Sequence, residues 1–166
     1  MGEAGRNRPL FFLDVDGPLL PFGDGSQRDP SGTGPTVHLA RLDPRVGLRL
    51  AALPCDLVWA TTWEDEANTV IAPRIGLPRL PVVNWPEPAI EDEREDQWFG
   101  LCWKTRPLVT WANRRPFIWV DDEITDADQD WVSAHHPGRA LLHRVPPARG
   151  LTDADFTTLD HWLREA

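Results

Sequence analysis

The chain has 166 residues, of which 41% are hydrophobic and 26% charged, a composition typical of a globular protein rather than a disordered segment. The formal net charge of −9 argues against a broad nucleic-acid surface, because phosphate binding relies on Lys and Arg. No run approaches the roughly 18 apolar residues of a membrane span, and the two cysteines have no metal or redox spacing. These features predict one cytoplasmic domain over residues 1–166, with its core at about 9–164.

Predicted strands and helices alternate along the chain. The strands are expected at 9–15, 55–60, 80–83, 117–120 and 139–143, and the helices at 44–53, 64–71, 105–113, 126–134 and 152–164. Asp43 precedes Pro44 as an N-cap, Thr152 has Asp155 three residues on as in a capping box, and Pro73 is expected to end its helix. The alternation predicts an α/β fold, a three-layer α/β/α sandwich with a mostly parallel sheet.

Two connecting segments are long enough to be considered as a cap over a site. Residues 23–35 are rich in Gly, Pro and Ser, and residues 77–98 are acidic and proline-rich, with the run EDERED inside. Both are expected to be loops, and the acidic block predicts a solvated loop or helix face. Neither segment has the length of a full cap domain.

Residues 11–18 read FFLDVDGP, an apolar run that ends in two aspartates and a glycine. A strand alternates its side chains, so Asp14 and Asp16 would face the same way at its carboxyl end, where Gly17 can break the strand. Two carboxylates this close repel each other unless a cation lies between them or one keeps a proton. The pattern predicts a Mg²⁺ site or a nucleophile beside a general acid. A solvated acidic turn is the simpler alternative.

Three more polar motifs follow apolar runs or open a helix. The run LVWA ends in Thr61 and Thr62, Lys104 precedes the expected helix 105–113, and the run FIWV ends in Asp121 and Asp122. Ligands of such sheets bind outside the carboxyl ends of the strands, so the strand-end motifs are expected at one site. Simpler alternatives are helix caps for the threonines and aspartates, and a surface lysine whose place is taken by Arg106, Arg114 or Arg115.

In this order the motifs resemble those of the haloacid dehalogenase (HAD) superfamily. The strings VWATTWEDEAN and PFIWVDDEITDAD are similar to the HAD domain of Swiss Army Knife RNA-repair proteins, and the resemblance spans about residues 9–145. It implies a Rossmann-like fold with little or no cap, and a phosphatase that depends on Mg²⁺. Pro18 departs from the family, which commonly has Thr or Val after the glycine.

The resemblance also implies a role for each motif. Asp14 would be the nucleophile that forms a phospho-aspartate, Asp16 the general acid and base, and Lys104 would orient Asp14. Thr61 would bind a phosphoryl oxygen, with Thr62 and Trp63 as further substrate contacts. Mg²⁺ would be held by Asp14, Asp16 and the pair Asp121 and Asp122. Because adjacent side chains diverge at a strand end, we expect Asp121 to bind the metal directly and Asp122 to act from behind it.

The substrate is expected to be a phosphorylated compound, either a nucleotide or a nucleic-acid end. Nine tryptophans and no tyrosine occur; Trp59, Trp119 and Trp162 are expected in the core. Trp63, Trp98 and Trp103 neighbour the motifs and could stack on a nucleobase, although ordinary packing is the simpler interpretation. Two alternatives remain: a catalytically idle HAD-like domain that binds a phosphorylated ligand or partner, and an enzyme of this fold that acts on carbon.

Overall fold

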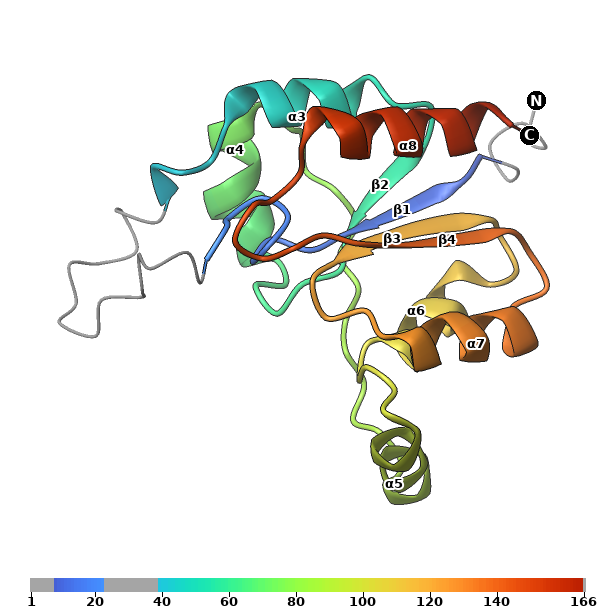
Figure 1. Ribbon diagram of the computed structural model, residues 1–166. Coiled ribbons are helices and arrows are strands. Elements are labelled where there is room, and N and C mark those ends of the chain that lie inside the picture. The colour runs from blue at the N-terminus through green and yellow to red at the C-terminus, as the bar shows by residue number, and fades with distance from the viewer. Residues whose placement is uncertain (1–7, 23–38, 166) are drawn as a thin grey trace, which may run out of the picture.

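The computed structural model describes residues 8–22 and 39–165, and within them a four-stranded sheet lies between two layers of helices (Figure 1). The strand order is β2-β1-β3-β4, and every neighbouring pair is parallel. This confirms the three-layer α/β/α architecture. The loop expected at 23–35 lies outside the described residues.

Two of the four strands are shorter than predicted, and the other two each end one residue later than predicted. The strands are β1 (Leu10–Leu13), β2 (Asp56–Trp59), β3 (Phe117–Asp121) and β4 (Ala140–Arg144). The central strands β1 and β3 are buried along their whole length, which explains their continuous apolar sequences. In the register of the sheet, Leu13 lies opposite both Trp59 and Val120. The chain therefore leaves β1, β2 and β3 at the same edge.

The prediction of a strand at residues 80–83 is wrong. This segment meets the sheet only through a bridge between Val82 and Trp59. The backbone of Leu80 is instead bound by the side chain of Asn68, which accepts a hydrogen bond from Leu80 N–H at 2.8 Å and donates one to its carbonyl at 2.9 Å. Pro81 has no N–H to give to a ladder. The backbone of Trp59 bonds to Pro81 and Val83, and the next bond of this parallel ladder would need an N–H at residue 81, so the proline stops the pairing after one residue.

Helices α3 (Pro44–Ala51), α4 (Ala72–Ile75) and α8 (Asp153–Arg164) cover one face of the sheet, and α6 (Thr105–Ala112) and α7 (Asp126–His135) cover the other (Figure 1). The expected caps are confirmed. The Asp43 side chain accepts a hydrogen bond from Arg45 N–H at 2.9 Å, and Thr152 and Asp155 form a capping box. These caps satisfy backbone groups that a helix start leaves unpaired.

The expected stop at Pro73 is wrong. The π-helix η1 (Ala67–Ile71) continues directly into α4, and Pro73 lies in the first turn of α4. Proline has no N–H to donate inside a helix, and the π-helical turn just before Pro73, in which Ala72 N–H bonds to the Ala67 carbonyl, has already interrupted the regular hydrogen-bond ladder. The helix ends instead at Gly76, whose φ of +76° is the left-handed conformation of a C-cap.

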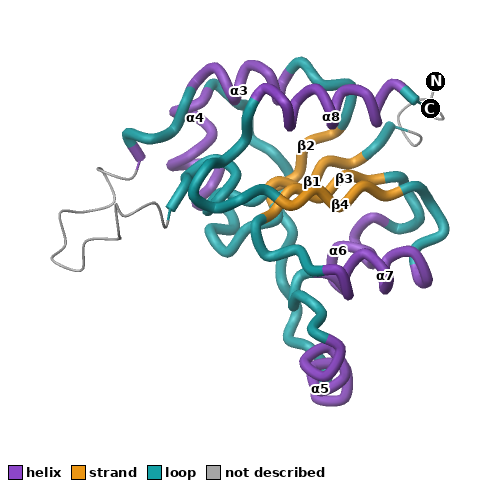
Figure 2. Tube along the Cα trace, viewed as in Figure 1, coloured by secondary structure: helices purple, strands orange, loops and turns teal. Residues whose placement is uncertain are grey.

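Helix α5 (Ile90–Phe99) lies within the segment expected to be a loop and carries the acidic run. None of its residues is buried, and it stands away from the layers that cover the sheet (Figure 2). The solvated helix face is therefore the correct interpretation of the acidic block. Packing was the simpler expectation for Trp98, but its side chain is 84% exposed.

The core lies on both faces of the sheet. Successive residues of β1 face opposite sides, so that Phe11 and Leu13 pack toward α3, α4 and α8, while Phe12 packs toward α6 and α7. Trp59 and Trp119 are fully buried, as expected. Both cysteines are free and buried, and burial raises the pKa of each thiol to about 12. No helix among the described residues is long and apolar enough to cross a membrane.

Candidate active site

Three carboxylates converge at the edge where β1 and β3 end. Asp14 directly follows β1, Asp121 is the last residue of β3, and Asp122 comes next. One carboxylate oxygen of each residue lies within 4.8 Å of the other two. Asp14 is 5% exposed and Asp121 is fully buried, whereas Asp122 is half-buried. The sheet thus concentrates negative charge where water is largely excluded.

Lys104 is the cation that faces this cluster. Its Nζ donates hydrogen bonds to Asp121 Oδ2 at 2.7 Å and to the Ala60 carbonyl at 3.2 Å, and it forms an ion pair with Asp14 Oδ1 at 3.4 Å. The residue is 2% exposed and is the only lysine of the chain. A surface lysine is therefore excluded. Arg106 pairs with acids of α5 instead.

Asp121 is held on both of its oxygens. Besides Lys104, the Trp119 indole donates to Oδ2 at 3.2 Å, and the Glu123 N–H donates to Oδ1 at 2.9 Å. The expectation that the adjacent side chains diverge is wrong, because one carboxylate oxygen of Asp121 and one of Asp122 lie within 4.8 Å of each other in the same cluster. Strand β3 ends at Asp121, so Asp122 no longer follows the alternation of a strand.

The cluster shifts the proton affinities of its members. Burial, and next the charge of Asp121, raise the pKa of Asp14 well above its usual value. The same two causes raise the pKa of Asp122 to about 6. Burial alone would lower the pKa of Lys104, but Asp14 and Asp121 outweigh it, so the pKa of Lys104 is raised and its ammonium stays charged. One lysine thus offsets only part of the acidic charge.

Gly17 makes the close approach of Asp122 possible. Its φ is +101°, a conformation that side chains rarely adopt, and a Cβ at this position would lie 3.0 Å from Cγ of Asp122. The glycine N–H donates to the Leu20 carbonyl at 3.0 Å and so closes the turn after Asp16. Glycine is therefore required here both for backbone conformation and for space.

Asp16 lies outside the group of three carboxylates. Its residue is partly exposed, and its Oδ2 accepts a hydrogen bond from the Trp63 indole at 3.2 Å. Trp63 also donates its backbone N–H to the Thr61 hydroxyl oxygen at 3.2 Å. The sequence predicted all three residues at the site, and the structure links them in one chain of contacts. Thr62 is exposed.

The sequence interpretation missed Trp85, which lies between prolines in a segment read as a loop. Its indole N–H donates to the Thr61 carbonyl at 3.0 Å. The rings of Trp85 and Trp103 meet edge to face with centroids 4.9 Å apart, and Lys104 Nζ lies 5.9 Å and 5.6 Å from these centroids. A tryptophan flanked by Asn84 and Pro86 in an otherwise polar segment was the available signal.

The donor set fits Mg²⁺. It consists of carboxylate oxygens, which are ligands that this hard cation prefers. Burial and the charge of Asp121 both raise the pKa of Asp14 and of Asp122, and a bound cation would offset both effects. Asp14, Asp121 and Asp122 are the residues that would hold the metal. The side chain of Asp16 is not among them.

The comparison with protein families returns one description, HAD domain in Swiss Army Knife RNA repair proteins, which matches residues 10–156. No match was found among curated proteins or among solved structures. The matched segment includes all four strands of the sheet and every residue of the cluster around Lys104. The chain therefore belongs to the HAD superfamily, in the family of HAD domains from Swiss Army Knife RNA repair proteins.

Proposed function

We propose that the protein is a Mg²⁺-dependent phosphatase that hydrolyses a phosphate monoester through a phospho-aspartate. Membership of the family supports a HAD-type hydrolase. The observation that carries the proposal is the position of Asp14, a buried carboxylate 3.4 Å from the chain's only lysine and within 4.8 Å of two further carboxylates. This arrangement would be costly as mere packing, because buried charges destabilise a fold unless they are paired.

Asp14 would attack the phosphorus atom. Its Oδ1 accepts the Val15 N–H at 2.8 Å and faces Lys104, and no other described residue is hydrogen-bonded to this carboxylate, so we expect Oδ2 to be the attacking oxygen. The new bond between Oδ2 and phosphorus forms as the bond between phosphorus and the leaving oxygen breaks. Water then attacks the phosphorus, the bond to Asp14 breaks, and inorganic phosphate is released.

Asp16 would move the protons. It would donate a proton to the leaving oxygen in the first step and take one from the attacking water in the second. Its partial exposure gives the carboxyl access to water, and the indole of Trp63 fixes its orientation. We infer that this contact, rather than metal binding, is the reason why the Asp16 side chain stands apart from the other three.

Lys104 and Thr61 would bind phosphoryl oxygens, Lys104 as a charge and Thr61 through its hydroxyl, whose oxygen is already held by Trp63 N–H. Mg²⁺ bound by Asp14, Asp121 and Asp122 would offset the repulsion between the carboxylate and the phosphate. Most of the rate enhancement in phosphoryl transfer comes from such positioning and charge compensation.

The family description names RNA repair, which supports a nucleotide or a nucleic-acid end as the substrate class. The net charge of −9 argues against a grip on long nucleic acid. We therefore propose recognition of a single phosphorylated unit, with any further strand left outside the site.

The proposal is tested by phosphate release from nucleotides, sugar phosphates and 3′-phosphorylated oligonucleotides, with Mg²⁺ and with excess chelator. Chelation should abolish turnover and Mg²⁺ should restore it, while Ca²⁺ should substitute poorly because its coordination shell is larger and looser. Asp14→Asn should abolish turnover, whereas Asp130→Asn, a matched change on the exposed side of α7, should leave it unchanged.

Two results would contradict the proposed function. Near wild-type turnover by Asp14→Asn would place the nucleophile elsewhere. If the wild-type protein binds phosphorylated ligands with Mg²⁺ but releases no phosphate from any of them, the catalytically idle alternative is correct.

A further inference from the structure

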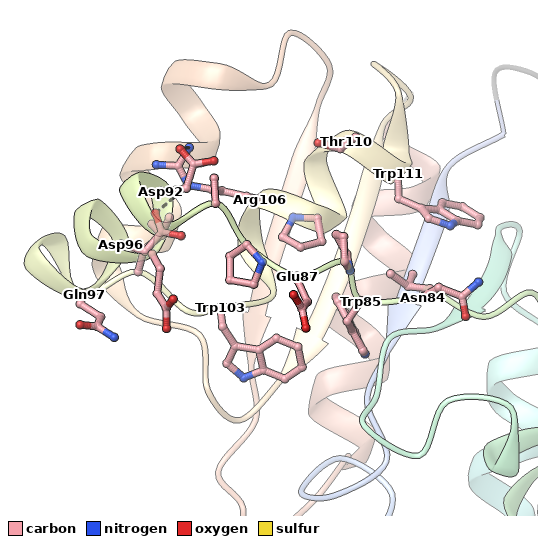
Figure 3. Close-up of a pocket in the computed structure, with 17 residues that line it drawn as sticks. Asn84, Trp85, Glu87, Asp92, Asp96, Gln97, Trp103, Arg106, Thr110 and Trp111 are labelled. Carbon is pink, nitrogen blue, oxygen red and sulfur yellow. Dashed lines mark hydrogen bonds and ion pairs between the residues drawn. The ribbon is translucent and has the colours of Figure 1, made fainter.

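A cavity lies beside the candidate active site, between α5, α6 and residues 83–89. Its volume is about 470 Å³, which is the size of a small-molecule site. Its walls carry three tryptophans, Trp85, Trp103 and Trp111, together with prolines and aliphatic side chains (Figure 3). Helix α5, which has no other contact with a core, forms one side of it. The acidic helix thus acts as a wall of this cavity.

The cavity adjoins Lys104 through two of these tryptophans. Trp85 and Trp103 line the cavity, and the same two rings stand next to Lys104 Nζ. Lys104 in turn contacts Asp14. A substrate whose phosphate lies at Asp14 would therefore extend its leaving group over Trp103, whose side chain is 47% exposed.

The charges of the lining select against a second anion. Arg106 is the only cation that lines the cavity among the described residues, and it is already paired with Asp92 at 3.6 Å and Asp96 at 2.7 Å. Glu87 and Glu93 add carboxylates that have no such partner in the lining. Carboxylates accept hydrogen bonds and cannot donate them when ionised. The cavity thus favours a ligand with N–H donors.

We propose that this cavity binds the nucleobase of the leaving group, that is, a planar heteroaromatic ring with N–H donors and without a second phosphate nearby. The inference rests on the proposed function, because it assumes that the phosphate lies at Asp14. Stacking on aromatic side chains contributes about 1–3 kcal/mol per base. The acidic lining accepts the N–H groups of the ring and repels the phosphates of a continuing strand. Substrate preference therefore depends on α5 and on the two tryptophans beside Lys104.

Measurements of ligand affinity test this inference independently of catalysis. Asp14→Asn leaves the substrate intact, so its affinity for guanosine 5′-monophosphate and for ribose 5-phosphate can be measured by calorimetry with Mg²⁺. The nucleotide should bind at least tenfold more tightly than the sugar phosphate. Stacking of about 1–3 kcal/mol corresponds to a ratio of about 5 to 150, so adding Trp103→Ala should bring the ratio close to 1, and Trp103→Phe should retain part of it.

Trp98→Ala is the matched control, since Trp98 is exposed and does not line the cavity; it should change neither affinity. Guanosine 3′,5′-bisphosphate and a 3′-phosphorylated trinucleotide should bind more weakly than the mononucleotide. Glu87→Lys should reduce this difference in affinity. Equal affinity for nucleotide and sugar phosphate, an unchanged ratio in Trp103→Ala, or tighter binding of the trinucleotide would overturn the inference. Base-dependent binding without turnover by the wild type would support the cavity and refute the proposed hydrolysis.

Discussion

Replacement of Lys104 by methionine should destabilise the protein in a way that depends on pH and on metal. The methionine fills most of the space of the lysine but removes the ammonium that contacts Asp14 and Asp121 at 3.4 Å and 2.7 Å. Three carboxylates within 4.8 Å of one another then lose the lysine that faces them. Breaking a buried ion pair on one side costs about 3–5 kcal/mol of unfolding free energy, a large share of the ~5–15 kcal/mol of a typical domain.

The loss should be largest at high pH. A carboxyl group whose pKa is raised in the folded state favours folding while it is protonated and opposes folding as pH rises through that pKa. Asp14 and Asp122 already have raised pKa values. Lys104 lowers the pKa of Asp14, so its removal raises that pKa further. At about pH 5 the carboxyls of the variant can take up protons, so the cost should be small. At pH 8 the full cost should appear.

Urea unfolding of Lys104→Met and of the wild type, at pH 5 and at pH 8, measures the loss of unfolding free energy at each pH. The difference at pH 8 corresponds to about 6–20 °C in Tm at ~2–4 °C per kcal/mol. Excess Mg²⁺ should recover part of it, because a ligand that binds only the folded state stabilises that state. Arg79→Met, which removes an exposed ion pair with Asp65, should cost under about 1 kcal/mol at either pH. A loss below about 1 kcal/mol at pH 8, or the same loss at both pH values, would refute the reasoning.

Three further predictions concern the metal site. Alanine at Asp121 or Asp122 should raise the Mg²⁺ concentration needed for half-maximal activity, more so at Asp121, and only Asp121→Ala should also lower the Tm, because Lys104 loses its 2.7 Å partner. Equal and mild effects of both variants would mean that neither aspartate binds the metal. In the wild type, this Mg²⁺ concentration should rise as pH falls through about 6, where Asp122 takes up a proton; a flat metal requirement between pH 5 and 8 would contradict the assignment. Gly17→Ala should also raise the Mg²⁺ concentration needed for half-maximal activity. Gly100→Ala, also at positive φ but with open space around it, should lower stability without changing the metal requirement. If the metal titrations of the two variants are the same, the contact between residue 17 and Asp122 has no role in metal binding.

The sequence predicted the parts of this site that depend on strand ends. An apolar run that stops at Asp14 or before Asp121 must leave its carboxylate at the edge of a parallel sheet, so these residues and Thr61 were found from pattern alone. Lys104 was harder to place, because a residue before a helix has no periodicity of its own. The convergence of Asp122 was not predictable, since it depends on where β3 stops pairing and on the missing side chain of Gly17.

The errors have physical causes that lie outside the local pattern. Residues 80–83 have the composition of a strand, but Pro81 has no N–H for the next hydrogen bond of the ladder to β2. Pro73 was expected to end its helix, but the π-helical turn before it interrupts the regular hydrogen-bond ladder, and the helix continues to Ile75. Helix α5 has no apolar face to detect, because none of its residues is buried. Its role as the wall of a cavity became visible only with the fold.

Because the chain's only lysine is buried, its chemical modification reports local opening of the structure at this edge of the sheet. Lys104 is the only side chain of this sequence that amine-reactive reagents can acylate, and mass spectrometry identifies the peptide that carries it. In the folded state Lys104 is 2% exposed, so acylation there requires a local opening. The rate of that acylation, relative to the unfolded chain, measures the free energy of opening. A phosphate analogue bound at the site should slow it, which provides a ligand assay that needs no turnover.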